Sequence, residues 1–313
     1  MRINWTVLLC IFFFSGLVRA EVRFKEGDRV LLYGNSFIER MQQNGFFEAA
    51  LQLANPQKGI ELRSLAWTGD ELGHRLRPER YVNHLNKLLN QWPADHVILG
   101  FGLYESFAGD PGIEKFKADL NGYLDEMKRR HPEANVILLS PIATEDLGHS
   151  HYPDPVRRNN EIKSYVDAMT EITDRRKIQF IDLFEFSKDQ YAGHEELLTD
   201  NGIHLNSYGH ELIAGQISRT VLGDRVYDEM DKDRIGSIAR AVSRKAQYVS
   251  TLVRPVNTVL YFGVRGRANE YNTEIPRYHE LIRKSDQRIH VMARDRTISF
   301  DPSPLTLDPL FNR

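Results

Sequence analysis

The feature that most constrains this chain is an alternation of short apolar runs with longer amphipathic stretches between residues 29 and 222. The short runs are rich in β-branched residues and leucine, and the longer stretches carry apolar residues at helical spacing. This order is typical of a parallel sheet covered by helices on both faces. The expected strands span 29–33, 61–65, 96–100, 135–140 and 179–182, and the expected helices span 36–53, 80–91, 113–130, 156–175 and 208–221. The chain is therefore predicted to form an α/β fold, a three-layer α/β/α doubly wound parallel five-stranded sheet whose ligand site lies beyond the carboxyl ends of the strands.

The pattern changes after Leu222. Residues 234–253 have one apolar stripe at helical spacing and none of the strand alternation seen earlier, and residues 276–282 suggest another short helix. The tail from Asp301 contains three prolines and is expected to be extended. We therefore expect a domain over 21–222, followed by a helical appendage and an extended tail over 223–313.

The first 20 residues are typical of a secretory signal peptide, with Arg2 before an apolar run and small residues near Ala20. An uncleaved membrane anchor is the alternative, but the apolar run is shorter than the roughly 20 residues that a bilayer span needs. The protein is therefore expected to be secreted or periplasmic, with no membrane contact after signal cleavage. The one cysteine, Cys10, lies inside this segment, so the mature chain would have no disulfide, catalytic thiol or cysteine metal site.

The charge balance excludes one class of partner. Lys and Arg total 41 and Asp and Glu total 43, which gives a formal net charge of -2. A chain with this balance has no global basic field that would attract nucleic acid or anionic lipid. Nucleic acid is therefore not an expected partner, and the oligomeric state is not indicated by the sequence.

A serine stands directly where the first expected strand turns into a helix, in the segment 32–37. At such a position the Ser36 hydroxyl is presented to the ligand site, and the Ser36 N–H lies at a helix N-terminus, where it can stabilise an oxyanion. The alternative is that Ser36 is only the N-cap of the helix, because serine is a common capping residue.

A histidine precedes the last expected helix of the sheet domain, in the segment 198–206. His204 has Asp200 and Asn201 a few residues upstream, and a histidine in this setting can act as general base toward a serine that the fold brings near it. A histidine in a polar loop can equally be a surface residue. The combination with Ser36 favours the catalytic interpretation.

Four segments in this order resemble the blocks of the SGNH/GDSL hydrolases. They are residues 34–36, Gly69 in the segment 67–70, residues 102–107 after the third strand, and His204. The resemblance spans about 29–222 and implies a flavodoxin-like SGNH hydrolase fold and an exported serine esterase that removes acyl or acetyl groups, on a carbohydrate or a small molecule. It also implies a role for each site residue: Ser36 as nucleophile, His204 as general base, Asp200 or Asn201 as the group that orients His204, and Ser36, Gly69 and Tyr104 as the oxyanion hole. No cofactor and no metal is required.

This sequence departs from the family pattern at three positions. Asn35 replaces the aspartate before the serine, Tyr104 stands where an oxyanion-hole asparagine is expected, and Asn201 is three residues before His204, where the family has aspartate. Loss of one oxyanion donor typically lowers turnover about 100-fold to 1000-fold. The alternative function is therefore a catalytically degenerate SGNH domain that binds glycans or proteins.

Other residues near the expected site allow weaker interpretations. His149 and His151 could bind a metal or could be solvated loop residues. Glu71 and Glu105 could form the carboxylate pair of a glycosidase, although nothing in their spacing favours it. Residues 254–257, 261–262, 265, 269–270, 281–282 and 286–289 are loosely similar to the region that follows the hydrolase domain in secreted SGNH-like proteins of planctomycetes and related bacteria.

Overall fold

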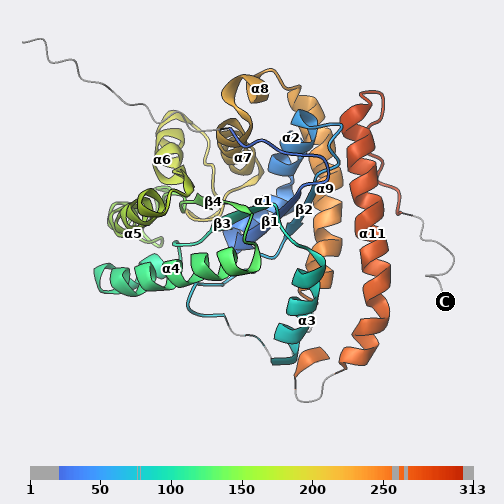
Figure 1. Cartoon of the computed structure of the whole chain (residues 1–313). Helices are drawn as coiled ribbons and strands as arrows, with labels where there is room; N and C mark the ends of the chain where they lie inside the picture. Colours follow the sequence, from blue (N-terminus) through green and yellow to red (C-terminus); the bar gives the residue numbers. More distant parts are fainter. Residues whose placement is uncertain (1–20, 76, 78, 256–260, 264–266, 306–313) are drawn as a thin grey trace, which may run out of the picture.

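The computed structural model describes residues 21–75, 77, 79–255, 261–263 and 267–305, so the predicted signal peptide and Cys10 lie outside the described residues. Five strands form one sheet with every pairing parallel, in the order β2-β1-β3-β4-β5 (Figure 1). The strands are β1 (Arg29–Gly34), β2 (Glu61–Ser64), β3 (His96–Gly100), β4 (Asn135–Leu139) and β5 (Gln179–Ile181). The predicted doubly wound parallel sheet is confirmed, and each strand lies within one residue of its predicted bounds.

Helices cover both faces of the sheet. They are α1 (Ser36–Asn44), α2 (Phe46–Ala54), α3 (Glu79–Gln91), α4 (Ile113–Arg130), α5 (Pro155–Arg176), α6 (Leu183–Gly193), α7 (Ser207–Leu222), α8 (Asp224–Asp228), α9 (Lys232–Val253) and α11 (Ala268–Arg294), with short 3₁₀ turns at Glu105–Ala108 and Asp110–Gly112. Alternate β1 side chains enter opposite layers: Val30 and Leu32 pack with α1, α2, α7 and α9, whereas Leu31 and Tyr33 pack with α3, α4 and α5. Within the described residues, no helix combines the length and the apolarity needed to cross a bilayer.

The single helix expected over 36–53 is instead two helices, because the chain turns at Gly45. Gly45 has φ +78°, a left-handed conformation that favours glycine, and its N–H donates to the carbonyl of Met41. A Cβ at Gly45 would lie 2.5 Å from the carbonyl oxygen of Ala239 in α9. The break therefore allows the start of α2 to approach the backbone of α9 closely.

Two other helix predictions need correction. The short helix expected over 276–282 is part of α11, which runs from Ala268 to Arg294 and includes Pro276. Its buried residues Ile289 and Met292 join the core cluster that contains α9, so packing stabilises a helix that local sequence signals underestimate. Helix α6 was not expected; it begins directly after β5, where the Asp182 side chain accepts hydrogen bonds from Phe184 N and Glu185 N.

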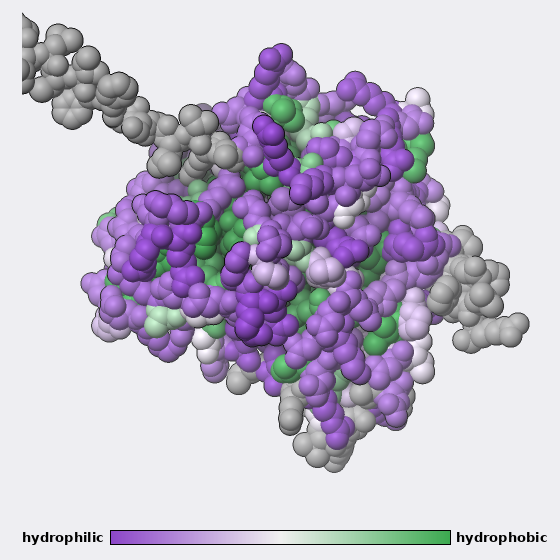
Figure 2. All heavy atoms as spheres, viewed as in Figure 1, coloured by the Kyte–Doolittle hydropathy of each residue, from purple (hydrophilic) through white to green (hydrophobic). Residues whose placement is uncertain are grey.

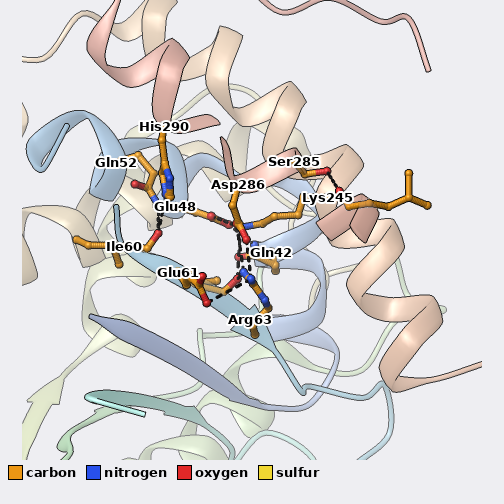
Figure 3. A network of polar contacts seen from close by, with 12 residues as sticks. Gln42, Glu48, Gln52, Ile60, Glu61, Arg63, Lys245, Ser285, Asp286 and His290 are labelled. Carbon is orange, nitrogen blue, oxygen red and sulfur yellow. Dashed lines mark hydrogen bonds and ion pairs between the residues drawn. The ribbon is translucent and has the colours of Figure 1, made fainter. Parts of the chain in front are cut away.

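A buried network of charges joins the helices after Leu222 to the sheet layer (Figure 3). Lys245 of α9 is fully buried and donates to Glu48 of α2 and, at 2.9 Å, to Asp286 of α11. The guanidinium of Arg63, from β2, binds both oxygens of Asp286 at 3.2 and 2.5 Å. Burial raises the pKa of Asp286, but the charges of Lys245 and Arg63 outweigh it, so the pKa lies below its ordinary value. Two cations thus neutralise two carboxylates inside the protein.

Candidate active site

Ser36 begins helix α1 at the carboxyl end of β1. The preceding Asn35 is the helix cap, because its side chain accepts the Phe37 N–H at 3.1 Å, so the interpretation of Ser36 as an N-cap is wrong. A Cβ at Gly34 would lie 2.5 Å from the carbonyl of Gly100, which explains why the tight turn before Ser36 requires glycine. The Ser36 side chain is therefore available for other contacts, in a site where the residue is 1% exposed.

His204 lies within hydrogen-bond reach of Ser36, although 168 residues separate them. The distance from Ser36 Oγ to His204 Nε2 is 3.5 Å. The loop that carries His204 is fixed at its base by a backbone bridge between Thr199 and Leu205, and Glu145 accepts the N–H groups of Leu198 and Thr199 at 2.9 and 2.8 Å. The structure therefore brings together the two residues on which the sequence interpretation depended.

Asn201 contacts the other ring nitrogen of His204. Asn201 Oδ1 accepts the backbone N–H groups of His204 and Ile203 at 2.9 and 3.3 Å, which fixes the orientation of the amide. Asn201 Nδ2 is then the atom 3.0 Å from His204 Nδ1. Because an amide nitrogen can only donate, this network assigns a bare Nδ1 and a proton on Nε2 to the neutral ring. A general base needs the opposite arrangement, with Nε2 free to accept the Ser36 proton.

Asp200 does not contact the His204 ring. Its carboxylate lies 3.7 Å from Nη1 of Arg40, and its side chain is 61% exposed. The pKa of His204 is lowered by burial and by the positive charge of Arg40, while the Asp200 charge opposes both. Of the two expected orienting residues, Asn201 occupies the position beside Nδ1, and Asp200 influences the ring only through its charge.

The expected oxyanion hole has two backbone donors and a phenol. Gly69 has φ +82°, and neither its N–H nor the Ser36 N–H donates to an acceptor within the described part of the chain. The Tyr104 hydroxyl forms a short hydrogen bond with Ser36 Oγ. Tyr104 therefore reaches the hydroxyl that is expected to be the nucleophile, so that a substrate carbonyl entering the expected hole would have to displace or share this contact.

Glu39 holds the loop that contains Gly69. Its Oε2 accepts both the N–H and the hydroxyl of Thr68 at 2.7 Å, and Arg254, at the end of α9, binds the same carboxylate at 2.9 and 2.5 Å. This connection was not found from the sequence. The signal available was only that Glu39 follows Ser36 by one helical turn, and nothing in the sequence pointed to Arg254.

The Glu105 carboxylate also accepts hydrogen bonds from backbone N–H groups, and this accounts for its position without a carboxylate pair. Its Oε1 accepts the Leu72 N–H at 2.9 Å and its Oε2 accepts the Gly102 N–H at 2.8 Å. Burial raises the pKa of Glu105, and the backbone N–H donors oppose that rise. Glu105 therefore ties the loop after β2 to the turn after β3.

His149 and His151 lie in an exposed loop, with their Nδ1 atoms 3.0 Å apart. Among the residues that the structure describes, no cluster of three or more His, Cys, Asp or Glu side chains could hold a metal ion. The two histidines thus have no third protein ligand in the described ranges.

Comparisons with known proteins agree with this fold. The model of the GDSL-like lipase/acylhydrolase family matches residues 32–212. A GDSL esterase/lipase of Arabidopsis thaliana is 28% identical over 137 residues, which are 40% of this chain and 53% of that protein. The chain thus spans about half the length of the curated relative it matches.

Two solved structures share the architecture. A protein described as a GDSL-like lipase from Parabacteroides merdae has 14% identity and a TM-score of 0.51, over 64% of this chain and 98% of that one. A catalytic mutant of an acetylxylan esterase from Geobacillus stearothermophilus has 15% identity and a TM-score of 0.50, over 64% of this chain and 97% of that one. Since the family model covers more than half of the chain, the protein belongs to the GDSL-like lipase/acylhydrolase family.

Proposed function

We propose that this protein is an exported hydrolase that removes acyl or acetyl groups from a carbohydrate ester, with Ser36 as nucleophile and His204 as general base. The observation that carries the proposal is the 3.5 Å approach of Ser36 Oγ to His204 Nε2 in a chain of acylhydrolase family. An acetylxylan esterase among the structures of the same fold supports acetyl groups on xylan as the first substrate class to test. Export is supported by the character of residues 1–20.

In this mechanism Ser36 Oγ attacks the ester carbonyl and its proton passes to His204 Nε2. The N–H groups of Ser36 and Gly69 stabilise the oxyanion, and His204 returns the proton to the departing alcohol. Water then attacks the acyl group on Ser36 Oγ, with His204 accepting its proton. The proton returns to Ser36 as the carboxylic acid leaves. Before the first step, the proton on Nε2 must move to Nδ1, where it faces the Asn201 amide. The site therefore has to leave its preferred tautomer to react, which predicts slow turnover.

A second function is favoured by two specific contacts. The Tyr104 hydroxyl is hydrogen-bonded to Ser36 Oγ, the atom that would attack the ester. Asn201 stabilises the tautomer of His204 that cannot accept the Ser36 proton. A domain with these contacts could bind an acylated glycan without cleaving it. In that case Ser36 and His204 would serve as hydrogen-bonding groups for the ligand.

The test compares the protein with Ser36→Ala, and with Ser303→Ala as a matched control at an exposed serine. Hydrolysis of p-nitrophenyl acetate and of acetylated xylan is measured together with labelling by a fluorophosphonate, which reports an active serine without requiring turnover. Activity and labelling that disappear only in Ser36→Ala would support the hydrolase. If both are absent, titration calorimetry with acetylated and deacetylated xylan tests the binding function, which requires selective affinity for the acetylated polymer.

A further inference from the structure

A cavity of about 640 Å³ lies between α3 and α4, on the sheet face opposite α1 and α7. Its size is within the range of small-molecule sites. Ser36, Gly69, Tyr104 and His204 are not among the residues that line it. Its wall includes the aromatic residues Tyr33, Trp67, Tyr81, Phe101 and Tyr123. The cavity is therefore distinct from the candidate active site, although both lie near the end of β1.

The position of α3 explains why this space is open. Figure 1 shows α3 beside the lower ends of α9 and α11, with α4 to its left. Both α3 and α4 pack on the same face of the sheet. The Tyr81 hydroxyl donates to the carbonyl of Val253 at 2.7 Å, and His84 Nε2 lies 3.0 Å from the carbonyl of Leu252. The Tyr81 ring also packs edge-on against Phe262, with centroids 5.6 Å apart. The C-terminal helices thus hold α3 toward the β2 edge and away from α4.

Among the described residues of the wall, the guanidinium of Arg75 stands apart from the other charged groups. Asp70 is bound by Arg77 at 2.5 and 2.7 Å, Asp119 pairs with Lys115, and Glu126 pairs with Arg130. In contrast, the exposed Arg75 has no carboxylate within ion-pair distance among the described residues. Its guanidinium lies over the ring of Tyr123, 4.7 Å from the centroid, and donates to the Leu72 carbonyl at 3.3 Å. The mouth of the cavity therefore favours an anion.

The inner wall contains an unsatisfied polar group. The Tyr33 hydroxyl is buried and has no hydrogen-bond partner within the described part of the chain, although Tyr33 lines the cavity. Buried hydroxyls are normally hydrogen-bonded, so an orphaned one beside a cavity needs an explanation. A ligand that displaces the Tyr33 ring slightly, or brings a polar atom to it, would supply the partner.

We propose that this cavity is a binding site for an organic carboxylate with an aromatic body. The aromatic part lies among Trp67, Tyr81 and Phe101, and the carboxylate pairs with Arg75 at the mouth. The site does not depend on ester hydrolysis, since no catalytic residue lines it.

Titration calorimetry with 2-naphthoate tests the proposal, with the neutral 2-naphthamide as its matched ligand. We expect one molecule of naphthoate per chain, bound about tenfold more tightly than the amide, because a charge-assisted hydrogen bond to Arg75 contributes this much. Arg75→Gln should remove the preference for the carboxylate. Ser36→Ala should leave binding unchanged.

Glycine variants test the location. Gly122 of α4 lines the cavity, and a Cβ there meets no atom within 4 Å, so Gly122→Trp places an indole in the cavity mouth without a backbone clash. Gly236 of α9 has equally open surroundings, and Gly236→Trp is the matched control. Gly122→Trp should abolish naphthoate binding and Gly236→Trp should not. Val82→Trp fills the cavity from the half-exposed side of α3 and should act like Gly122→Trp if that variant does not fold.

Three results would overturn the proposal that the ligand binds in this cavity. They are no binding of naphthoate to the protein, binding that persists in the folded cavity-filling variants, and binding that is lost in Ser36→Ala. The last result would assign the ligand to the candidate active site. Equal affinity for naphthoate and naphthamide would refute the role of Arg75 and with it the anionic ligand class.

Discussion

Asn201 holds His204 at two points, through its oxygen to the backbone N–H at 2.9 Å and through its amide nitrogen to ring Nδ1 at 3.0 Å. Because the oxygen is also bonded to Ile203 N, the amide cannot be reversed without leaving N–H groups facing each other. The imidazole is thus within reach of Ser36, but its neutral form carries the proton on Nε2, the nitrogen that the proposed mechanism needs free. The site differs from a Ser-His-Asp triad in having an amide in place of a carboxylate at residue 201, and not in the position of the His204 ring.

Asn201→Asp should increase esterase turnover. The carboxylate keeps both backbone hydrogen bonds and can accept a hydrogen bond from a protonated Nδ1, which leaves Nε2 free to act as base. The reverse change in a serine protease lowers turnover about 10⁴-fold, so we expect a gain of at least about tenfold here. Because an adjacent carboxylate raises the pKa of His204, the pH at which activity appears should also move upward. Asn90→Asp, at an exposed position on α3, is the control for added charge.

Turnover should be highest with asparagine at position 104, intermediate with the native tyrosine and lowest with phenylalanine. The shorter asparagine side chain supplies an amide N–H donor for the oxyanion and does not form the hydrogen bond that Tyr104 makes with Ser36 Oγ. Phenylalanine supplies no donor. Relative to tyrosine we expect a gain of about 10-fold or more for Tyr104→Asn. Steady-state kinetics on p-nitrophenyl acetate give the order. Equal gains in Tyr104→Asn and Tyr104→Phe would mean that the phenol only obstructs the serine.

Arg254→Gln should lower turnover more than it changes KM. Without the guanidinium, Glu39 is free to leave Thr68, and the Gly69 N–H loses its fixed position for the transition state. We expect about a tenfold loss in kcat and little change when Thr68→Val is added, because both act through one chain of contacts. Arg244→Gln is the matched control, because Arg244 lies on α9, donates to the Ser303 carbonyl and lies over the Phe300 ring, away from Glu39. A rise in KM alone would contradict the positioning role.

His210 should make the protein sensitive to acid. Burial, together with the charges of Arg40 and His204, lowers the pKa of His210 from 6.5 to about 3. The folded state therefore binds fewer protons than the unfolded state between these values, and its stability is complete above pH 6.5 and declines as the pH falls toward 3. The slope from this group is about 1.4 kcal/mol per pH unit. Urea unfolding at pH 7.5 and pH 5 should show a smaller decline for His210→Leu, and parallel declines would exclude His210 as the source.

Lys245→Met should destabilise the fold strongly. The change leaves Glu48 buried without its cation, and removal of one partner from a buried pair costs about 3–5 kcal/mol. Adding Glu48→Leu should recover a large part of this loss, since the buried carboxylate is removed as well. Denaturant unfolding of both variants measures the difference. A double variant no more stable than Lys245→Met would show that packing around the lysine stem, and not its charge, holds α9.

The sheet and the Ser36–His204 pair could be predicted because each depends on local signals, namely apolar runs, a glycine before the serine, and a histidine before a helix. The break at Gly45 could not, because it reflects the approach of Ala239 nearly 200 residues later. Asp200 was a reasonable candidate by spacing, yet the side chain turns to Arg40, a residue of α1. Arg254 and Glu39 meet only through tertiary packing, so no spacing rule could identify them.

The buried charges around Lys245 also determine which fragments of the chain can be expressed as soluble protein. The family match ends at residue 212, and a fragment cut there keeps Glu48 and Arg63 but discards Lys245 and Asp286. Such a fragment would present a carboxylate, a guanidinium and an apolar helix face to water, which are the conditions for aggregation during expression. In this protein the segment matched by the family model is therefore shorter than the segment that we expect to be needed for a stable product.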